Sequence, residues 1–328
     1  MFATLTPQTR ASITTPRVVP SDQQPVLEIE EITKRYRGSK ALDGVSFALQ
    51  PGVFGLLGPN GAGKSTLIKA LMGLVRITSG EARVLGLDSK RHFRRVRELV
   101  GYMPEDDSIF PGLKGVESVA YAGELAGLPY IDALRRAHEV LDYVGLKEER
   151  NREEQTYSTG MRQKQKLAQA IVHDPRLVFL DEPTSGLDPL GRRRMLRLIR
   201  GLYDRTGTSV VLSTHILNDV EAICDSVVII GHGKLLVHDT IENLRRPADE
   251  SVMVGLESAD PEFGKALSRA GVRWQELHPD KLQVFGPPRE AAEHAMQAAR
   301  ESGAQVRRIE SGRNTLEEIF LEAVGSGR

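Results

Sequence analysis

The sequence has one cysteine, no net charge and no long apolar run, and each feature excludes a class of protein. Cys224 alone cannot form an internal disulfide, which fits a reducing compartment. The 44 basic and 44 acidic residues balance, so no overall field draws the chain to nucleic acid. No apolar stretch approaches the roughly 18 residues of a membrane span. We therefore expect a soluble protein without a nucleic-acid partner.

The first 25 residues lack hydrophobic periodicity. They are rich in Thr, Pro, Gln and Ser, and they have no continuous apolar core of the kind that a secretory signal needs. This composition predicts a disordered tail over residues 1–25. With 328 residues in total, the chain has room after the tail for one large domain and a smaller one.

The most informative segment is residues 58–66, which match the phosphate-binding loop pattern G-x-x-x-x-G-K-[ST] at every specified position. The segment consists of Gly58, Pro59, Asn60, Gly61, Ala62, Gly63, Lys64, Ser65 and Thr66. An apolar run over residues 53–57 precedes it. Helical spacing follows it, in Leu67, Ile68, Leu71 and Leu74. The loop is therefore expected to join a buried strand to the start of a helix.

The residue types of this loop suit the binding of phosphate. Glycine lets the backbone come close to a ligand, so successive N–H groups can converge on phosphate oxygens. The helix predicted to begin at Lys64 adds free N–H groups and a positive dipole end. Lys64 would reach the β- and γ-phosphates of a nucleotide, and the Ser65 hydroxyl would ligate Mg²⁺. The alternative is a glycine-rich turn that only caps a helix, which the complete match disfavours.

Beyond the loop, strands alternate with helical patterns, which predicts an α/β fold with a mostly parallel sheet covered on both faces. Residues 26–50 read as two or three strands and residues 81–87 as another. Two buried strands, residues 177–180 and 210–212, end in polar side chains. These are Asp181 and Glu182 after the first strand, and Ser213, Thr214 and His215 after the second. Open α/β sheets bind ligands at such strand ends.

Two further segments have an architecture of their own. Helical patterns over residues 116–145 predict an insertion, and Ser158 can N-cap the helix that follows it. Residues 246–328 read as β-α-β-β-α-β, which suggests a small ferredoxin-like module closed by a helix over 315–324. Support of a dimer and regulation are both open as the role of this module.

Five short elements occur in one order along the chain. They are the phosphate loop, Pro104-Glu105, residues 157–161, residues 180–183 and residues 213–215. In this order and at these spacings the chain resembles the nucleotide-binding subunit of an ABC transporter. The resemblance covers about residues 26–245. It implies a P-loop NTPase fold with an antiparallel β subdomain and a helical subdomain at about residues 105–165, which binds ATP and Mg²⁺.

The resemblance implies roles for the matching residues. Glu182 is similar to the general base that polarises the attacking water, and His215 and Lys64 are similar to the groups that contact the γ-phosphate. Asp181 resembles the carboxylate that holds Mg²⁺ through water, beside Ser65.

Other matching residues lie outside this catalytic group. Tyr36 matches the aromatic side chain that stacks on adenine. Ser158 and Gly160 match a signature segment that serves the ATP of a partner subunit. Asp188 ends the segment Ser185-Gly186-Leu187-Asp188, which is similar to the loop that couples two subunits across their interface in this family. Two nucleotides are thus expected between two subunits that pair head to tail, and we expect a homodimer.

The sequence departs from the common family pattern at three positions. Thr159 and Met161 stand where the usual signature has glycine and glutamine, and Glu105 stands where many members have glutamine. A carboxylate at residue 105 can ligate Mg²⁺ or accept a hydrogen bond from water, but it cannot donate a hydrogen bond as the amide of glutamine can. Such variants, with a C-terminal module ending in a helix, resemble exporters of the drug and polysaccharide type.

The expected function is therefore an ATPase that drives a separate membrane permease, held at the cytoplasmic face of the cell membrane by that permease. One alternative is a soluble ABC ATPase that acts on ribosomes or DNA. Such proteins usually have tandem nucleotide domains or a long coiled coil, and this chain has neither. A second alternative is a nucleotide sensor without catalysis, which the intact Lys64, Asp181, Glu182 and His215 argue against.

Overall fold

The computed structural model describes residues 24–106, 109–245, 250–312 and 315–325. Contacts within the chain divide it into two compact units. The first comprises the described residues up to Cys224 together with Ile230–Leu235, and the second comprises Asp225–Ile229 and the described residues from Leu236 onward. The predicted tail falls on residues 1–25, of which 1–23 lie outside the described residues. The predicted boundary after residue 245 adjoins residues 246–249, which also lie outside them.

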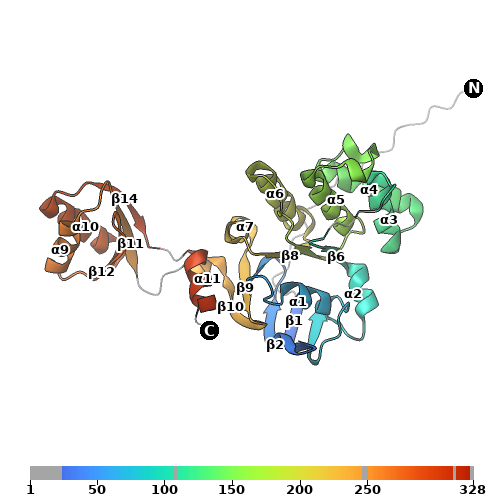
Figure 1. Cartoon of the computed structure of the whole chain (residues 1–328), viewed down its shortest axis with the longest axis horizontal. Coiled ribbons are helices and arrows are strands. Elements are labelled where there is room, and N and C mark those ends of the chain that lie inside the picture. Colours follow the sequence, from blue (N-terminus) through green and yellow to red (C-terminus); the bar gives the residue numbers. More distant parts are fainter. Residues whose placement is uncertain (1–23, 107–108, 246–249, 313–314, 326–328) are drawn as a thin grey trace, which may run out of the picture. The chain divides into compact units, whose positions relative to one another are not determined.

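The predicted antiparallel β subdomain is confirmed (Figure 1). Its four strands have the order β2-β1-β4-β5, and they are β1 (Leu27–Tyr36), β2 (Ser39–Leu49), β4 (Ser79–Val84) and β5 (Leu87–Asp88). The prediction of one strand over residues 81–87 is wrong. Leu85 and Gly86 both have a positive φ, 52° and 77°, so the backbone turns there and β4 pairs back onto β5.

The predicted parallel sheet is the largest sheet among the described residues. The six-stranded sheet has the order β10-β9-β3-β8-β7-β6. Its strands are β3 (Val53–Leu57), β6 (Val100–Met103), β7 (Leu177–Asp181), β8 (Ser209–Thr214), β9 (Ser226–Gly231) and β10 (Lys234–Thr240). Neighbouring strands among β3, β8, β7 and β6 pair in parallel. Every residue of β3, β7 and β8 is buried, which explains why these strands read as continuous apolar runs.

Helices follow the strands of this sheet, as the alternation predicted. They are α1 (Lys64–Leu71), α2 (Phe93–Leu99), α6 (Pro189–Thr206), α7 (Leu217–Ile223) and α8 (Ile241–Arg245). Leu67, Ile68 and Leu71 of α1 are buried, but Leu74 lies beyond the end of the helix and is half exposed. The helical spacing therefore overestimated the length of α1 by one turn.

The helical insertion is confirmed and consists of α3 (Gly115–Leu125), α4 (Tyr130–Val144) and α5 (Thr159–Ile171). Figure 1 shows these helices grouped together, apart from the antiparallel sheet. Two 3₁₀ turns, Glu149–Asn151 and Glu154–Thr156, precede α5. Gly145 ends α4 in the left-handed conformation, with φ 72°, because only a residue without a Cβ adopts it at no cost.

The second unit contains a sheet of its own. Its elements are β11 (Ser251–Leu256), α9 (Pro261–Arg269), β12 (Trp274–His278), β13 (Lys281–Phe285), α10 (Pro288–Ser302) and β14 (Val306–Ser311). The sheet order β12-β13-β11-β14, with antiparallel neighbours, is the ferredoxin-like arrangement that was predicted. The final helix α11 (Leu316–Gly325) packs against α8. No helix of the described residues is both long and apolar enough to span a membrane.

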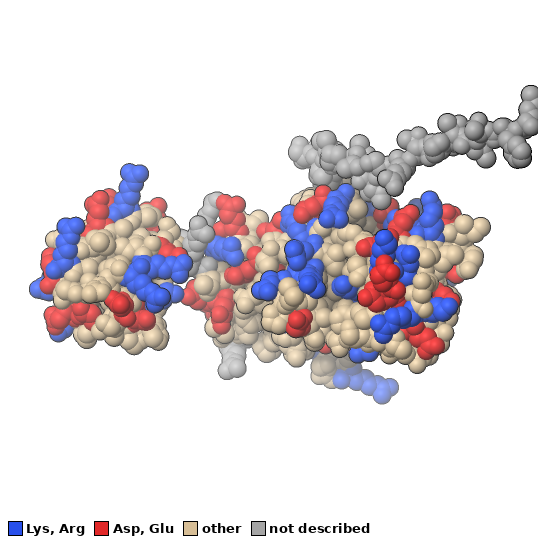
Figure 2. Space-filling view, turned by 90° about the horizontal axis from the view of Figure 1, so that it is seen from above, with Lys and Arg blue, Asp and Glu red and all other residues tan. Residues whose placement is uncertain are grey.

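Basic and acidic side chains are mixed on one face of the described residues (Figure 2). On the face shown in Figure 2, Lys and Arg are interspersed with Asp and Glu instead of being gathered by sign. This distribution agrees with the balance of 44 basic and 44 acidic residues.

Candidate active site

The site forms where three neighbouring parallel strands end at one edge of the sheet. In the register of these strands, Leu57 of β3 lies opposite Thr214 of β8, and Ser213 lies opposite Asp181 of β7. The segments that follow these positions therefore begin side by side. They are the phosphate loop, the His215 segment and the Glu182 segment, so residues more than 100 positions apart in the chain become neighbours.

The phosphate loop leads directly into α1. Gly63 is the N-cap residue and has a φ of 108°, and a Cβ at this position would lie 2.4 Å from the Ala41 carbonyl oxygen. Only glycine fits both the backbone conformation and the close approach. The first turn of α1 contains no acidic residue. Its free N–H groups and positive dipole end therefore face the loop without a competing internal anion.

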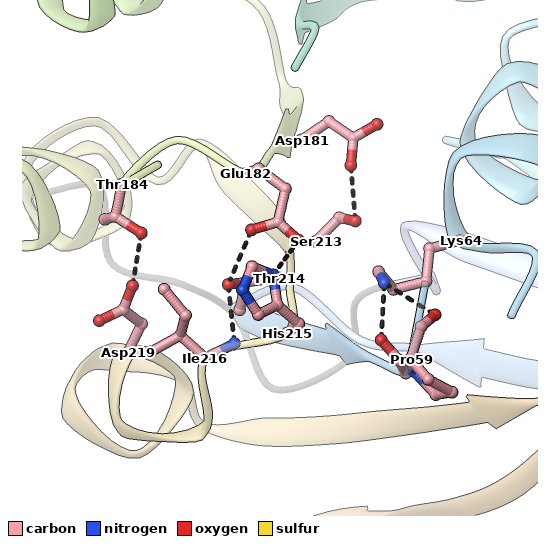
Figure 3. A network of polar contacts seen from close by, with 11 residues as sticks. Pro59, Lys64, Asp181, Glu182, Thr184, Ser213, Thr214, His215, Ile216 and Asp219 are labelled. Carbon is pink, nitrogen blue, oxygen red and sulfur yellow. Dashed lines mark hydrogen bonds and ion pairs between the residues drawn. The ribbon is translucent and has the colours of Figure 1, made fainter. Parts of the chain in front are cut away.

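Lys64 is buried at this helix start, with 7 % of its surface exposed. Its Nζ donates to the Gly58 carbonyl oxygen at 2.6 Å and approaches the Pro59 carbonyl oxygen at 3.4 Å (Figure 3). Burial lowers the pKa of Lys64, and the negative charges of Glu182, Asp181 and Glu105 act in the opposite direction. Three carboxylates therefore act on the Lys64 ammonium, and they come from two segments, Asp181 and Glu182 at the end of β7 and Glu105 after β6.

Asp181 ends β7 and is almost fully buried. Its Oδ1 accepts a hydrogen bond of 2.8 Å from the Ser213 hydroxyl, which fixes one oxygen of the carboxylate (Figure 3). A buried carboxylate with a partner on the neighbouring strand is a defined ligand group, not a solvated strand end.

Glu182 has an unusual backbone. Its φ is 49°, in the left-handed region that non-glycine residues rarely adopt, and its N–H donates to the Ser213 carbonyl oxygen at 2.9 Å. Strain of this kind persists where the surrounding structure over-determines it, often at active sites. The side chain is buried, and its Oε2 accepts from the Thr214 hydroxyl at 3.3 Å.

His215 pairs with this glutamate. Its Nδ1 lies 2.9 Å from Glu182 Oε1 (Figure 3), while 56 % of the His215 side-chain surface is exposed. The carboxylate is thus held by two groups of the β8 end, Thr214 and His215. A carboxylate oriented in this way can accept a proton from a bound water, and the neighbouring imidazole can contact an anion.

Glu105 joins the site from β6, through the segment after Met103. The Lys166 ammonium donates to the Glu105 carbonyl oxygen at 2.8 Å and to the Asp106 carbonyl oxygen at 3.1 Å. Lys166 lies on α5 and is buried. Burial, together with the charges of Asp181, Asp106 and Glu105, raises the pKa of Tyr102 to about 12. The acidic edge of the site therefore reaches the end of β6.

Tyr36 ends β1 with nearly half of its surface exposed. The Lys34 ammonium lies 4.6 Å from the centre of its ring and donates to the Arg76 carbonyl oxygen at 2.7 Å. The cation steadies the ring while leaving it accessible, so Tyr36 is available for stacking on a planar base.

The signature residues lie apart from the phosphate loop. Ser158 N-caps α5, and its Oγ accepts from the Met161 N–H at 3.3 Å. Thr159 packs against Gly186, and Gln163 Nε2 donates to the Ser185 carbonyl oxygen at 3.1 Å. Among the described residues, no hydrogen bond or ion pair links this segment to the phosphate loop.

Asp188 also serves a local role in the chain, since its carboxylate accepts from the Gly191 N–H at 2.9 Å and N-caps α6. The structure thus brings Lys64, Asp181, Glu182, His215 and Glu105 into one cluster. It leaves Ser158, Gly160 and Asp188 outside that cluster.

Oxygen ligands for Mg²⁺ are available in the cluster. No group of three or more His, Cys, Asp or Glu side chains forms a metal cage in the part of the chain that the structure describes. Mg²⁺ needs no such cage, because it retains waters and is held by one or two carboxylates and the phosphates of a substrate. The hydroxyl of Ser65 and the carboxylates of Asp181 and Glu105 fit that pattern.

Several residues of the site were not singled out from the sequence. Ser213 and Thr214 were placed at a strand end, but their hydroxyl bonds to Asp181 and Glu182 were not foreseen. Lys166 gave one signal, a cation among the buried positions of an amphipathic helix. Its partners include two carbonyls 60 and 61 residues away, which a local pattern cannot indicate.

Comparisons with known proteins agree with the geometry. A family model described as ABC transporter matches residues 42–185. The chain is 35% identical over 306 residues to the daunorubicin/doxorubicin resistance ATP-binding protein DrrA of Streptomyces peucetius, covering 91% of this chain and 92% of that protein. It is 29% identical to the bacitracin transport ATP-binding protein BcrA of Bacillus licheniformis, covering 92% and 98%.

Solved structures give the same result for the fold. The ATP-binding subunit of an ABC transporter matches with a TM-score of 0.60 and 30% identity, covering 67% of this chain and 91% of that chain. The dimeric ATP-binding cassette MJ0796, bound to ADP and phosphate, matches with a TM-score of 0.61 and 22% identity, covering 66% and 98%.

Proposed function

Because the chain belongs to the family of ATP-binding subunits of ABC transporters, we propose that it hydrolyses ATP with Lys64, Glu182 and His215 to drive drug export. Members of this family are ATPases that power a separate permease. The proposed cargo class follows the relatives, whose names refer to daunorubicin and doxorubicin resistance, linearmycin resistance and bacitracin transport. The proposed nucleotide-binding domain comprises residues 26–245, and residues 246–328 form an accessory module.

The contact between Glu182 and His215 carries the proposal. Glu182 is buried, strained and bonded at both oxygens, so its carboxylate is directed and not free to rotate. In the proposed reaction it orients a water for in-line attack on the γ-phosphate and accepts its proton. Lys64 and His215 then stabilise the charge that develops on the phosphoryl oxygens. Catalysis in this scheme rests on positioning and charge, because the protein forms no covalent bond with the phosphate.

Mg²⁺ is the proposed cofactor, held by Ser65 with Asp181 and Glu105 near it. When bound, it would neutralise part of the negative charge of the ATP phosphates. The Asp181–Ser213 hydrogen bond supports this role, because it orients the carboxylate in advance. Tyr36 is the proposed platform for adenine.

The permease is the proposed membrane partner, and the protein would lie at the cytoplasmic face of the membrane through it. An exposed aromatic and aliphatic stripe on the helical insertion supports such a contact. Tyr121 and Leu125 lie one turn apart on α3 and are 43% and 66% exposed. The Phe110 ring packs edge-on against Tyr121, with centroids 5.1 Å apart, so the stripe is connected to the segment that follows Glu105.

The proposed assembly is a head-to-tail homodimer. Ser158, Gly160 and Asp188 lie outside the Lys64 cluster of their own chain, so a second subunit has to supply these groups if they contact ATP. The α5 N-terminus, with Ser158 as its cap, offers the N–H groups of an anion site to that partner.

The experiment that tests the function uses Glu182→Gln, which preserves shape and removes the proton acceptor. We expect turnover to fall by about 10²–10⁴-fold while ATP remains bound. The variant, trapped with ATP in native membranes, is then captured and its partners identified. Glu98→Gln, on the exposed surface of α2, is the matched control.

A multi-span permease captured with Glu182→Gln supports the transporter assignment. Normal phosphate release by this variant would remove Glu182 from the proposed role. Capture of ribosomal or nucleic-acid partners without a permease would contradict the transporter assignment and favour a soluble ATPase.

A further inference from the structure

Besides the contacts of Glu182 with Ser213, Thr214 and His215, one further bridge links the two segments that carry Glu182 and His215. Thr184 is fully buried, and its hydroxyl donates to Asp219 Oδ2 at 2.5 Å (Figure 3). Asp219 is 1% exposed, so this hydrogen bond lies in the interior of the first unit. It lies beside the exposed His215–Glu182 contact but shares no atom with it.

The positions of the two residues explain what the bridge holds. Thr184 follows Glu182 by two residues, and Asp219 follows His215 by four, in the first turn of α7. Both bridges therefore connect the same two chain segments. The imidazole contact is open to solvent, whereas the Thr184–Asp219 contact is sealed and short, so the buried bridge is the stronger restraint on the separation of the segments.

A third segment, α6, also contacts Asp219. Arg192, on α6, has its Nε 3.9 Å from Asp219 Oδ1. That buried Nε makes no hydrogen bond among the described residues, so only the ion pair with Asp219 offsets the cost of burying it. Burial raises the pKa of Asp219, while the Thr184 hydroxyl and Arg192 lower it. A buried carboxylate that needs two partners is a poor device for stability alone, because its desolvation offsets the attraction.

Among the described residues, no hydrogen bond or ion pair joins Asp219 to the phosphate loop, and none of the roles proposed above includes Asp219. We infer that Asp219 is a positioning residue for hydrolysis: by holding Thr184, it sets the separation of the Glu182 and His215 segments and keeps the imidazole against the carboxylate. This inference rests on the proposed roles of Glu182 and His215. In this inference, the Thr184–Asp219 hydrogen bond affects the position of Glu182 and His215 during hydrolysis and does not affect the binding of ATP.

The test is Thr184→Val in the full-length chain, which keeps the shape of the side chain and removes the hydroxyl. Thr184→Ser retains the hydroxyl and is the matched control. We expect the kcat of ATP hydrolysis to fall by about 10- to 100-fold in Thr184→Val, the cost of misplacing a reacting group by roughly 1 Å. The KM for ATP should stay within about twofold, because Lys64 and the phosphate loop are untouched. Thr184→Ser should restore most of the kcat.

A double-mutant cycle with His215→Ala separates positioning from a general loss of structure. If the bridge acts through His215, Thr184→Val should lower the kcat by less than about twofold in the His215→Ala background. An additive loss in the double variant would overturn the inference, as would a Thr184→Val enzyme with normal kcat. Should Thr184→Val not fold, Thr184→Ala in both backgrounds provides the same comparison.

The same cycle distinguishes a failure of the proposed role of His215 from a failure of the inference about Asp219. If His215→Ala alone leaves kcat unchanged, the proposed role of His215 fails, and the inference fails with it. If His215→Ala lowers kcat but neither Thr184→Val nor Thr184→Ala does, the inference alone is overturned. A rise in KM without a fall in kcat would overturn it as well, because the bridge would then serve ATP binding.

Discussion

The ammonium of Lys166 on α5 donates to the backbone carbonyl of Glu105, 2.8 Å away. This hydrogen bond links α5 to the acidic segment after β6. Lys166 is 4% exposed and also bonds the Asp106 carbonyl. The two segments come from the helical insertion and the parallel sheet. A single buried cation therefore connects α5, whose N-terminus is proposed to face the partner subunit, with the segment of Glu105, a proposed ligand of Mg²⁺.

Lys166→Met should break this connection, because methionine fills the space without donating. Hydrogen bonds from a charged donor contribute about 1.5–3 kcal/mol, so we expect the free energy of unfolding of the first unit to fall by about that amount. Urea denaturation measures the change, with Lys147→Met at an exposed position as the control. Equal stability of the two variants would show that the carbonyls find other partners.

Tyr36→Ala should weaken nucleotide binding without slowing the chemical step. Stacking of a base on an aromatic ring contributes about 1–3 kcal/mol, which corresponds to a rise in the KM for ATP of roughly 5- to 150-fold. Tyr36→Phe retains the ring and should behave like the unmodified protein. Steady-state ATP hydrolysis measures both constants, and a fall in kcat at unchanged KM would remove Tyr36 from adenine binding.

The titration of Asp219 gives a pH dependence with a definite sign. Its pKa is raised in the folded protein, so the folded state holds this proton more tightly than the unfolded state does. The contribution of Asp219 to stability is therefore complete at pH values below its unfolded pKa, and it is lost as the pH rises through the folded pKa.

Asp219→Asn cannot titrate and should lose this dependence. We expect the stability difference between the parent and Asp219→Asn to change in favour of the asparagine variant as the pH rises from about 4 to 7. Urea denaturation at a series of pH values measures it, with Glu98→Gln as the surface control. A difference that moves the other way would mean that partners, not burial, dominate the titration.

The sequence was sufficient where structure depends on neighbouring residues. The phosphate loop, the N-cap at Ser158 and the left-handed end of α4 at Gly145 all follow from short patterns, and the structure contains each of them. The six-element order of the second unit was likewise readable, because its strands and helices are separate in the chain. The end of the strand predicted over residues 81–87 could not be found in this way. The turn at Leu85 depends on the pairing of β4 with β5, which a local pattern does not show.

Contacts between distant residues could not be predicted in this way. Thr184 and Asp219 are 35 residues apart, and each sits in a sequence that reads as an ordinary turn or helix start. Their pairing depends on the parallel register of β7 and β8, which brings the segments after both strands together. A family resemblance identifies the residues of its own motifs, but it does not include the groups that hold those motifs in position.

The proposed head-to-tail dimer can be tested by measurements of ATP hydrolysis alone. Lys64→Ala disables the phosphate loop of its own chain, and Ser158→Arg blocks the signature that would serve the partner. Each variant alone should form only defective sites, so neither should hydrolyse ATP. In a mixed dimer, the intact loop of the Ser158→Arg chain would meet the intact signature of the Lys64→Ala chain, and one site would be complete.

Random mixing makes half of the dimers mixed, and each mixed dimer has one complete site of two, so about a quarter of the parent activity should return. Mixing each variant with itself is the control, and a titration of the ratio should give maximal activity near equal amounts. The prediction follows from the contacts of one chain, because Ser158 caps α5 and the next residue, Thr159, packs against Gly186, while no hydrogen bond among the described residues joins Ser158 to the phosphate loop. If mixing restores nothing while both variants still associate, each chain completes its own site, and the proposed dimer is wrong.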